Sequence, residues 1–553
     1  MDCRKKTRAR WLLSAASISL AGLAHAAPPN AGQTLQNIEA ARPTLPTHAD
    51  PAVEIQQPRP APTADGGIKI PVSSFSITGS KVYSAQELQP LVAEGVGPNL
   101  TLSEIEALVA RITQHYRSNG FLVAYAYLPA QDIQNGKIEI AVLEGNYGAV
   151  VVRNEGVLAS GKLNIAAGEA VNIAPLERNL LLLADTPGVE VKSTLRPGAS
   201  VGTSDLLVEV TPGKRISGSI DLDNYGNNFT GQNRLGATVN FNNPTGHGDV
   251  LSFRGLTGGS GMNYGRISYQ LPVNNDGTKI GIAYSDMAYK LGKEFSSLDA
   301  NGNAQIGTLF ASHPIIRSRL SNLNAQLSVD EKRIEDRIDS TDSVVKKTAQ
   351  VWNLGLSGDH RDSMGGGGIN SFSATLSFGT VNINSPVAKA IDDLTAKIDG
   401  HYGKLFLNAL RLQSITDATS LFVSYTGQFA SNNLDSSEKF SLGGAFGVRA
   451  YPNGEAPADT AQLITVELRH NLPAGFQLVG FVDTARAKLI EDRWALATAD
   501  NQRNLSGAGL GLNWVHPEGF SVTAFYAHKL GHEKATSDTD HSGRFWIQAV
   551  KSL

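Results

Sequence analysis

Cysteine is almost absent from this chain of 553 residues, whose one cysteine is Cys3. Cys3 lies within a leader-like stretch, far before the small residues at which such a leader is cleaved. It is therefore neither a disulfide partner nor a lipid-attachment cysteine. The mature chain is predicted to be free of cysteine, so its stability must come from packing and hydrogen bonds alone.

Long apolar segments are also missing. After the leader, no apolar run approaches the ~20 residues that a membrane-spanning helix needs. A membrane protein without such helices must be a closed β-barrel, because only closure satisfies every backbone group in lipid. A soluble periplasmic protein is the alternative, and the pattern of the strands has to decide between the two classes.

The chain lacks an excess of charge of either sign, because 48 basic and 51 acidic residues leave a net charge of -3. This balance indicates no nucleic-acid partner. Aromatic residues make up only 7% of the chain, whereas glycine occurs 56 times. Such a composition favours strands and turns over helix bundles.

The N-terminus has the pattern of a secretory signal peptide over residues 1–26. Basic residues precede a short apolar stretch at 11–23, and Ala24-His25-Ala26 fits a small-x-small cleavage site. A cytoplasmic chain anchored by its first helix is the alternative, but the apolar stretch is too short to span a bilayer comfortably. Export is predicted, with the mature protein beginning near Ala27.

Residues 27–69 are rich in proline and alanine, which predicts a linker that is stiff where prolines cluster. One short helix is expected at 33–41. The alternative for this segment is a frayed or disordered tail, since so short a polar helix is marginal by itself.

The first predicted folded unit spans residues 70–146. Thr101 and Glu104 form a capping box, and apolar residues then recur at helical spacing until Gly120 stops the helix. Asn135-Gly136 predicts a tight turn between two strands. The expected strands of this unit lie at 75–80, 121–128 and 137–143.

A second unit, residues 147–213, repeats the plan. Its helix is expected from Pro175 to Leu183. Its strands are expected at 149–153, 189–195 and 205–210. Each unit taken alone is a small α+β domain, and the two stand in tandem before a region of different pattern.

From residue 214 to residue 553 the hydrophobicity alternates with a period of two. Ile464, Val466 and Leu468, for example, alternate with polar neighbours that include Glu467. A periplasmic sandwich would alternate too, but a barrel places the apolar face in lipid and the polar face in a wet lumen. About 340 residues at roughly 20 per strand and loop give about 16 strands, and an even number returns both chain ends to the periplasm.

One arginine and one aspartate stand out in this region. Arg449 follows the glycine-flanked run 443–447, and Asp483 ends the strand-like Phe481-Val482-Asp483. The arginine fork suits a carboxylate, and each group needs the other wherever water is restricted. A surface turn with an unrelated, solvated aspartate is the alternative interpretation of the pair.

The run Val448-Arg449-Ala450-Tyr451-Pro452, together with Asp483, resembles the lid-loop and barrel-wall motifs of the TpsB family. These are the outer-membrane transporters of two-partner secretion, of the ShlB, FhaC and HecB type. Ala450 occupies the position where the family most often has glycine. The stretch 223–249 is similar to the opening barrel strands of the ShlB type, and the tandem units resemble POTRA domains. The C-terminus departs from many barrels by ending on Leu553 rather than on an aromatic residue.

The resemblance, which covers about residues 70 to 553, implies a transmembrane antiparallel β-barrel of about 16 strands preceded by two POTRA domains. The barrel would lie in the outer membrane as a monomer surrounded by outer-membrane lipids, with the POTRA domains in the periplasm. Those domains would bind an unfolded TpsA-like exoprotein (an adhesin, haemolysin or toxin), which the pore would pass to the cell surface or medium. Relatives of FhaC carry a lumen-plugging helix where residues 33–41 lie.

The lid loop would tuck into the lumen with Arg449 paired to Asp483, and Tyr451 and Pro452 would shape its tip. A BamA-like or TamA-like insertase is the alternative function. Relatives of those types carry five or three POTRA domains rather than two. A solute porin needs no POTRA domain, and an exported enzyme would need a nucleophile–base pair or a metal cluster.

No catalytic residues, metal ligands or cofactor site are predicted, and the protein is expected not to be an enzyme. Asp538 begins a calcium-like loop, but Ala549 stands where the bidentate glutamate is required. Gly507, Gly509 and Gly511 are better suited to close packing within a barrel than to a dinucleotide site. The charged run 330–347 is expected to be an external loop with flanking strand ends.

Overall fold

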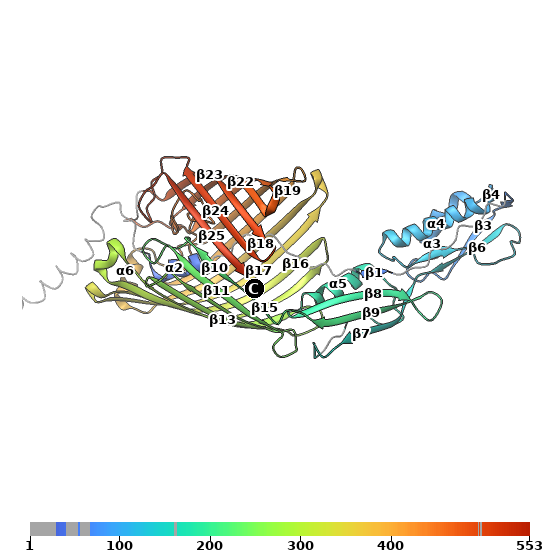
Figure 1. Ribbon diagram of the computed structural model, residues 1–553, viewed down its shortest axis with the longest axis horizontal. Helices are drawn as coiled ribbons and strands as arrows, with labels where there is room; N and C mark the ends of the chain where they lie inside the picture. The colour runs from blue at the N-terminus through green and yellow to red at the C-terminus, as the bar shows by residue number, and fades with distance from the viewer. Residues whose placement is uncertain (1–28, 40–52, 56–66, 160–162, 496, 498–499) are drawn as a thin grey trace, which may run out of the picture.

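The computed structural model describes residues 29–39, 53–55, 67–159, 163–495, 497 and 500–553. The predicted signal peptide, 1–26, and most of the predicted linker, 27–69, lie outside these residues. Two small α+β units and a β-barrel follow one another along the long axis of the molecule (Figure 1). Within the described ranges, no helix is both long and apolar enough to cross a membrane.

The first unit is built on a three-stranded sheet in the order β3-β6-β5, with α4 packed against it. Thr101 caps α4, and the predicted capping box with Glu104 is present. The strand expected at 121–128 is much shorter, because only β5 pairs with β6 there. The elements of this unit are β2 (Lys69–Pro71), β3 (Ser74–Thr78), α3 (Ala85–Leu88), β4 (Asn99–Thr101), α4 (Leu102–Ser118), β5 (Tyr125–Tyr127) and β6 (Lys137–Leu143).

A buried carboxylate closes the core of the first unit. The Tyr116 hydroxyl donates to Glu144 at 2.9 Å, and the backbone N–H groups of Lys81 and Val82 donate to the same oxygen at 2.6 and 2.7 Å. Burial, and then the Glu144 carboxylate, raise the pKa of Tyr116. The phenol therefore remains a neutral donor that ties the end of α4 to the loop after β6.

The second unit has a four-stranded sheet in the order β1-β8-β9-β7. Asn172 caps its helix, accepting from the N–H of Ala174 at 2.9 Å. A short strand from the linker region, β1, pairs in parallel with β8 and forms one edge of the sheet. The elements are β1 (Val53–Ile55), β7 (Asn146–Asn154), α5 (Ile173–Ala184), β8 (Val189–Pro197) and β9 (Thr203–Pro212).

The rest of the chain forms a closed antiparallel barrel of 16 strands, β10 to β25, as the sequence predicts. The last strand pairs with the first, from Ser219 opposite Ser552 to Asp223 opposite Gln548. The strands are β10 (Ile216–Asp223), β11 (Arg234–Asn242), β12 (Val250–Thr257), β13 (Met262–Pro272), β14 (Lys279–Lys290), β15 (Ala300–Arg317), β16 (Ser321–Ile338), β17 (Ser343–Asp362), β18 (Gly368–Ile383), β19 (Gly400–Ser414), β20 (Thr419–Ala430), β21 (Thr460–Asn471), β22 (Phe476–Lys488), β23 (Gln502–His516), β24 (Phe520–Lys529) and β25 (Gly543–Ser552).

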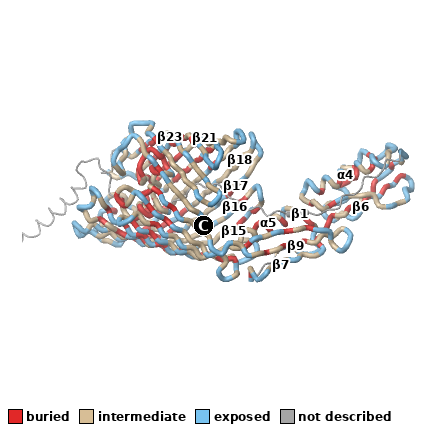
Figure 2. Tube along the Cα trace, viewed as in Figure 1, coloured by how far each residue is buried: buried red, intermediate tan, exposed pale blue. Residues whose placement is uncertain are grey.

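Strand β14 shows how the barrel divides its side chains. Ile282 and Tyr284 are exposed on the outer face, whereas Ala283 between them and Ser285 and Met287 beyond them are buried inside. The tube in Figure 2 shows the same alternation along the barrel strands. An apolar outside and a mixed inside are what a barrel in lipid requires.

The charged run 330–347, expected to be an external loop with flanking strand ends, consists almost entirely of those strand ends and has only a short turn between them. Asp330 to Ile338 continue β16, Ser343 to Lys347 begin β17, and only the turn around η4 (Asp339–Thr341) separates them. The charges of this run lie on both faces of β16. Lys332 and Asp336 face the lumen, where they contact the lid loop and the helix α2 (Ala31–Glu39), and Glu331 and Arg333 lie on the opposite face. A wet lumen accommodates only the first set.

The short helix α2 (Ala31–Glu39) lies inside the barrel against β14, β15 and β16 (Figure 1). The Ala31 N–H at its N-terminus donates to the Asp336 carboxylate at 2.7 Å. Glu39 at its other end accepts from the hydroxyls of Tyr264 and Ser285 at 2.8 and 3.0 Å. The helix begins two residues before the predicted range of 33–41, and residues 40–41 lie outside the described part.

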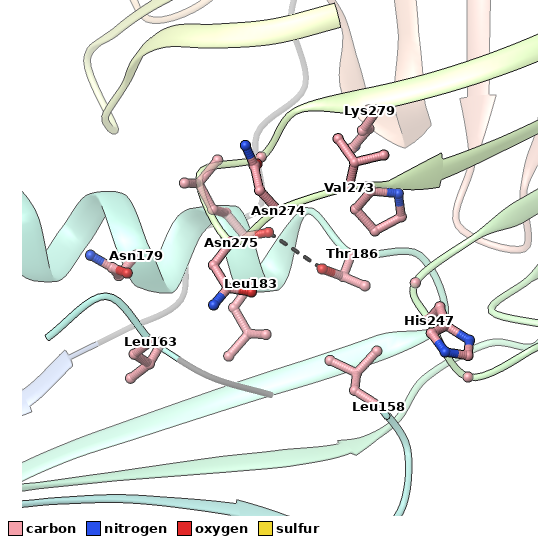
Figure 3. Close-up of a pocket in the computed structure, with 15 residues that line it drawn as sticks. Leu158, Leu163, Asn179, Leu183, Thr186, His247, Val273, Asn274, Asn275 and Lys279 are labelled. Carbon is pink, nitrogen blue, oxygen red and sulfur yellow. Dashed lines mark hydrogen bonds between the residues drawn. The ribbon is translucent and has the colours of Figure 1, made fainter. Parts of the chain in front are cut away.

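Helix α5 joins the second unit to the barrel. Arg317, at the end of β15, donates two hydrogen bonds to Asp185 beyond the C-terminus of α5, at 2.7 and 2.8 Å. Arg178 of α5 donates to the Pro314 carbonyl at 2.8 Å. A cavity of about 190 Å³ lies beside this junction and is lined by residues that include Leu183 and His247 (Figure 3).

We expect Arg317→Ala to loosen the second unit from the barrel, because a bidentate, largely buried ion pair is lost. Spin labels on α5 and on β18 should then report a broader distance distribution, with the amount of assembled barrel unchanged. Asp185→Ala should broaden the distance distribution in the same way. Arg153→Ala, which removes an exposed ion pair with Glu209, is the control and should leave the distribution unchanged. An unaltered distribution in Arg317→Ala would show that the pair does not hold the junction.

Candidate functional site: the lid loop and its anchors

The connection between β20 and β21 folds back into the barrel. This segment, residues 431–459, is here called the lid loop. Leu442, Val448, Tyr451 and Ala458 within it are completely or almost completely buried. Its tip is a tight turn in which the Val448 N–H donates to the Leu442 carbonyl at 2.7 Å. Glycine is needed there, because a Cβ on Gly443 would lie 2.2 Å from the Pro452 carbonyl oxygen.

Arg449 projects from this tip to the barrel wall, where the structure brings it together with Asp483 of β22. Its Nε and Nη2 donate to the two carboxylate oxygens at 2.9 and 2.8 Å, and its backbone N–H donates at 3.1 Å. Nη1 donates to Glu467 of β21 at 2.8 Å. The Arg449 side chain is 5% exposed and that of Asp483 is fully buried, so neither charge can rely on water.

Aromatic rings complete the surroundings of this arginine. The guanidinium carbon lies 3.4 Å from the centre of the Phe481 ring and 4.9 Å from that of Phe525. Trp546 of the last strand donates its indole N–H to the Arg449 carbonyl at 2.7 Å. A planar guanidinium is suited to combine stacking with bidentate pairing. Arg449 thus connects the lid loop to β21, β22, β24 and β25.

Ala450 and Gly507 form a close contact between the lid loop and the wall. Ala450 is fully buried, and a Cβ on Gly507 of β23 would lie 2.6 Å from the Ala450 Cβ. Tyr451 is equally buried and donates its hydroxyl to the Glu533 carbonyl at 3.0 Å. The small residue at position 450 is therefore accommodated by the missing side chain at position 507.

Glu455 is a second buried anchor, to which the sequence assigned no role. Arg503 of β23 donates to it at 3.0 Å. Thr536 and Ser537, in the connection between β24 and β25, each donate a hydroxyl at 2.8 Å and a backbone N–H at 2.8 to 3.0 Å. No short sequence motif signals these contacts, because Arg503 lies 48 positions away on β23 and Thr536 and Ser537 lie more than 80 positions away.

Acidic residues fix the other end of the lid loop. Glu438 pairs with Lys332 of β16 at 2.6 Å and Lys404 of β19 at 2.8 Å. Asp435 pairs with Lys347 of β17 at 2.5 Å. The lid loop therefore places its own cation against acids on one side of the wall and its own acids against lysines on the other.

The sequence matches known families in both its barrel and its first α+β unit. Residues 202–514 match the profile of the haemolysin secretion/activation proteins ShlB/FhaC/HecB, and residues 70–145 match the ShlB-type POTRA domain. The chain belongs to this family. It is an outer-membrane transporter of two-partner secretion, whose POTRA domains lie in the periplasm and which works with a secreted TpsA-like partner.

Individual relatives span nearly the whole chain. The haem/hemopexin transporter HuxB of Haemophilus influenzae is 28% identical over 502 residues, which cover 88% of each chain. The structure of CdiB from Escherichia coli superposes with a TM-score of 0.71 at 20% identity, over 89% of this chain and 93% of that chain. BamA from Haemophilus ducreyi, without POTRA domains 1–3, gives a TM-score of 0.52 at 15% identity, over 88% and 100%. The likeness to BamA shows a common fold.

We expect Gly507→Ala to push the lid loop of this transporter off the wall, because the added Cβ would lie 2.6 Å from the Cβ of Ala450, which is fully buried. Single-channel conductance in a planar bilayer should rise. Gly265→Ala on β13, where a Cβ meets nothing within 4 Å, should conduct like the wild type. Equal conductance in both variants would show that contact at position 450 does not seat the lid loop.

Proposed function

We propose that this transporter rests in a closed state, with the lid loop and α2 inside the barrel. An unfolded exoprotein bound in the periplasm passes to the cell surface or medium once the lid loop leaves its seat. The observation that supports this proposal most directly is the buried ion pair between Arg449 and Asp483.

The buried charges set the barrier to opening. Removing one partner of a buried ion pair costs about 3–5 kcal/mol, because the other charge stays buried without compensation. Release of Arg449 strands Asp483 and the arginine itself, whereas Glu467 keeps its pair with Arg469 at 2.7 Å. Thermal motion alone therefore opens the lid loop rarely, and occupation by the client is what makes opening favourable.

The client is a secreted protein of the adhesin, haemolysin or toxin class. The description of the matching family, haemolysin secretion/activation proteins, supports this class. A pore that transports an unfolded chain makes few contacts in the lumen that depend on the client's side chains. Selection of the client therefore falls to the periplasmic domains.

The POTRA domains offer sheet edges on which an extended client can add a strand. The sheet of the first domain ends at β3 and β5, and its edge strand β5 carries Tyr125 and Tyr127. In the second domain, the β8 edge already pairs with β1. Main-chain hydrogen bonds at such an edge give affinity for an extended peptide without a fixed sequence. The second sheet still has β7 (Asn146–Asn154) as its other edge, so both domains present an edge to an extended client.

Transport in this proposal requires no catalysis by the chain. The periplasm offers no ATP, and the client's own folding outside the cell supplies the direction. Folded segments cannot return through the lumen, so each segment that folds outside retains the length already exported.

Arg449→Ala should reduce client secretion by on the order of tenfold while the barrel still assembles, because Asp483 is left as an unpaired buried charge on the wall that the client must pass. Arg449→Lys should recover only part of the secretion, since lysine cannot pair bidentately or stack. The measurements are client in the medium and heat-modifiable barrel in the outer membrane. Unaffected secretion in Arg449→Ala would refute the role of the lid loop.

The overall function is tested by co-expression with the large exported protein of the neighbouring gene, with and without residues 70–213. Client in the medium only when these residues are present supports recognition by the POTRA domains. No release in either case, together with defective assembly of other barrels when the gene is deleted, would favour an insertase instead.

A further inference from the structure

The outer face of the barrel carries a compact group of charges near the extracellular ends of β16 and β17. Lys332 of β16 and Lys347 of β17 face the lumen, where they pair with acids of the lid loop. Since side chains alternate along a strand, their neighbours face outward. The outward charges, here called the charged face, are Glu331, Arg333, Glu335 and Arg337 of β16 and Lys346 of β17.

A row of large apolar residues lies directly below the charged face. Its members are register partners across four strands, namely Leu309 of β15, Val329 of β16, Trp352 of β17 and Phe378 of β18. In the next row toward the extracellular side, Glu331 lies between Gly307 and Gln350. The outer surface of the barrel thus changes from apolar to polar within one step of the register.

The length of β16 places the charged face outside the hydrocarbon core of the membrane. The strand has 18 residues, whereas a tilted strand crosses the core with about 9–11. Arg317, just before its first residue, contacts the second POTRA domain, so the surplus residues lie at the extracellular end. Outward charges are destabilising inside the core and nearly neutral at its boundary. The boundary therefore lies between Val329 and Glu331.

Arg333 is the cation of the charged face whose charge is not neutralised. Glu335 pairs with Arg337 at 2.8 Å and with Lys346 at 3.1 Å, so one carboxylate serves two cations. Within the part of the chain that the structure describes, Arg333 forms no ion pair, and its register partners are the uncharged Gln305 and Thr348. Three basic residues against two acidic ones leave the charged face with an excess of positive charge.

We propose that the charged face is a binding site for the phosphorylated sugar headgroup of lipopolysaccharide in the outer leaflet. Arg333 pairs with a phosphate of the lipid, and Lys346 offers a second cation beside it. The acyl chains of the same lipid lie against the apolar row below. The site is on the outside of the barrel, so the inference goes beyond the proposed function and does not depend on passage of the client.

The chemistry of the charged face fits a sugar phosphate. A guanidinium presents paired N–H donors that match the oxygens of a phosphate. The amide and hydroxyl side chains of Asn303, Gln305 and Thr348 on the neighbouring strands both donate and accept hydrogen bonds, as sugar hydroxyls require. Charge and hydrogen-bonding capacity therefore complement the same headgroup.

The height of the charged face favours lipopolysaccharide over a phospholipid. The six residues from Glu331 to Arg337 rise about 20 Å along the strand, or about 14 Å above the boundary at a tilt of about 45°. The headgroup layer of an ordinary phospholipid leaflet is only about 5–8 Å deep. A headgroup of several sugars is needed to reach the whole charged face.

Lipid A, whose sugars carry phosphates, is the probe for this site. Its binding to the full-length transporter, purified free of lipopolysaccharide in a neutral detergent, is titrated by native mass spectrometry. Arg333→Gln removes the charge and keeps a polar side chain. Arg486→Gln is the matched control, because Arg486 lies on the outer face at the extracellular end of β22, where it donates to Gln502 at 3.1 Å.

We expect Arg333→Gln to weaken the affinity for lipid A about fivefold, as the loss of one exposed ion pair does, and Arg486→Gln to bind like the wild type. Dephosphorylated lipid A should bind the wild type and Arg333→Gln equally. Equal affinities for lipid A in all three proteins, or equal weakening in both variants, would overturn the site. Reduced client secretion by Arg333→Gln with unchanged affinity for lipid A would also overturn it, and would assign the charged face to the client.

Thermal stability provides a second measurement. A ligand that binds only the folded barrel raises its unfolding temperature. Added lipid A should therefore raise the temperature at which the wild type and Arg486→Gln lose their heat-modifiable form, and should not raise it for Arg333→Gln combined with Lys346→Gln. Inorganic phosphate in place of lipid A should have no effect. An equal rise with inorganic phosphate would show a simple anion site and contradict the lipid site.

Discussion

The burial of Arg449 against Asp483 is the interaction on which the rest of this structure depends. A bidentate ion pair between arginine and a fully buried carboxylate is costly to break, because the remaining charge has no water to solvate it. The loop that carries the arginine must therefore stay inside the barrel, and the wall that carries the aspartate must leave room for it. Gly507, Phe481 and Trp546 all serve that one contact.

On the other side of the lid loop the ion pairs are reversed, with acidic residues on the loop and basic residues on the wall. Asp435 and Glu438 meet lysines of β16, β17 and β19, while Glu455 meets Arg503 and the connection after β24. The lid loop is thus supported around much of the barrel circumference. A client that displaces it must break several buried pairs, which makes the closed state stable without sealing the pore permanently.

The sequence predicted the architecture well because alternation and even strand number follow from the bilayer itself. Arg449 and Asp483 were found from a motif and from the need of each charge for the other. Glu467 was recognised only as a lumen residue, since its place beside Arg449 depends on the register of β21 with β22. Register over long strands is a tertiary property that local pattern does not contain.

Other details were beyond the sequence for related reasons. The partners of Glu455 lie in a distant loop whose path is set by the closed barrel. The charged run 330–347 was assigned mainly to a loop because charge usually marks exposed turns, whereas here the charges occupy both faces of two long strands, β16 and β17. Ala450, in the glycine position of the motif, fits because it lies against Gly507 of β23. The two residues meet only after the lid loop has folded into the barrel.

The most direct test of the account is to lock the lid loop in place reversibly. Asn227 donates to the Asn453 carbonyl of the lid loop at 3.4 Å, so Asn227→Cys with Asn453→Cys in a Cys3→Ser background can be joined by a short, reducible thiol crosslinker. We expect client release to stop when the crosslink forms and to resume when it is reduced, and we expect neither single-cysteine variant to be affected. Client release at the wild-type rate through the crosslinked barrel would contradict it.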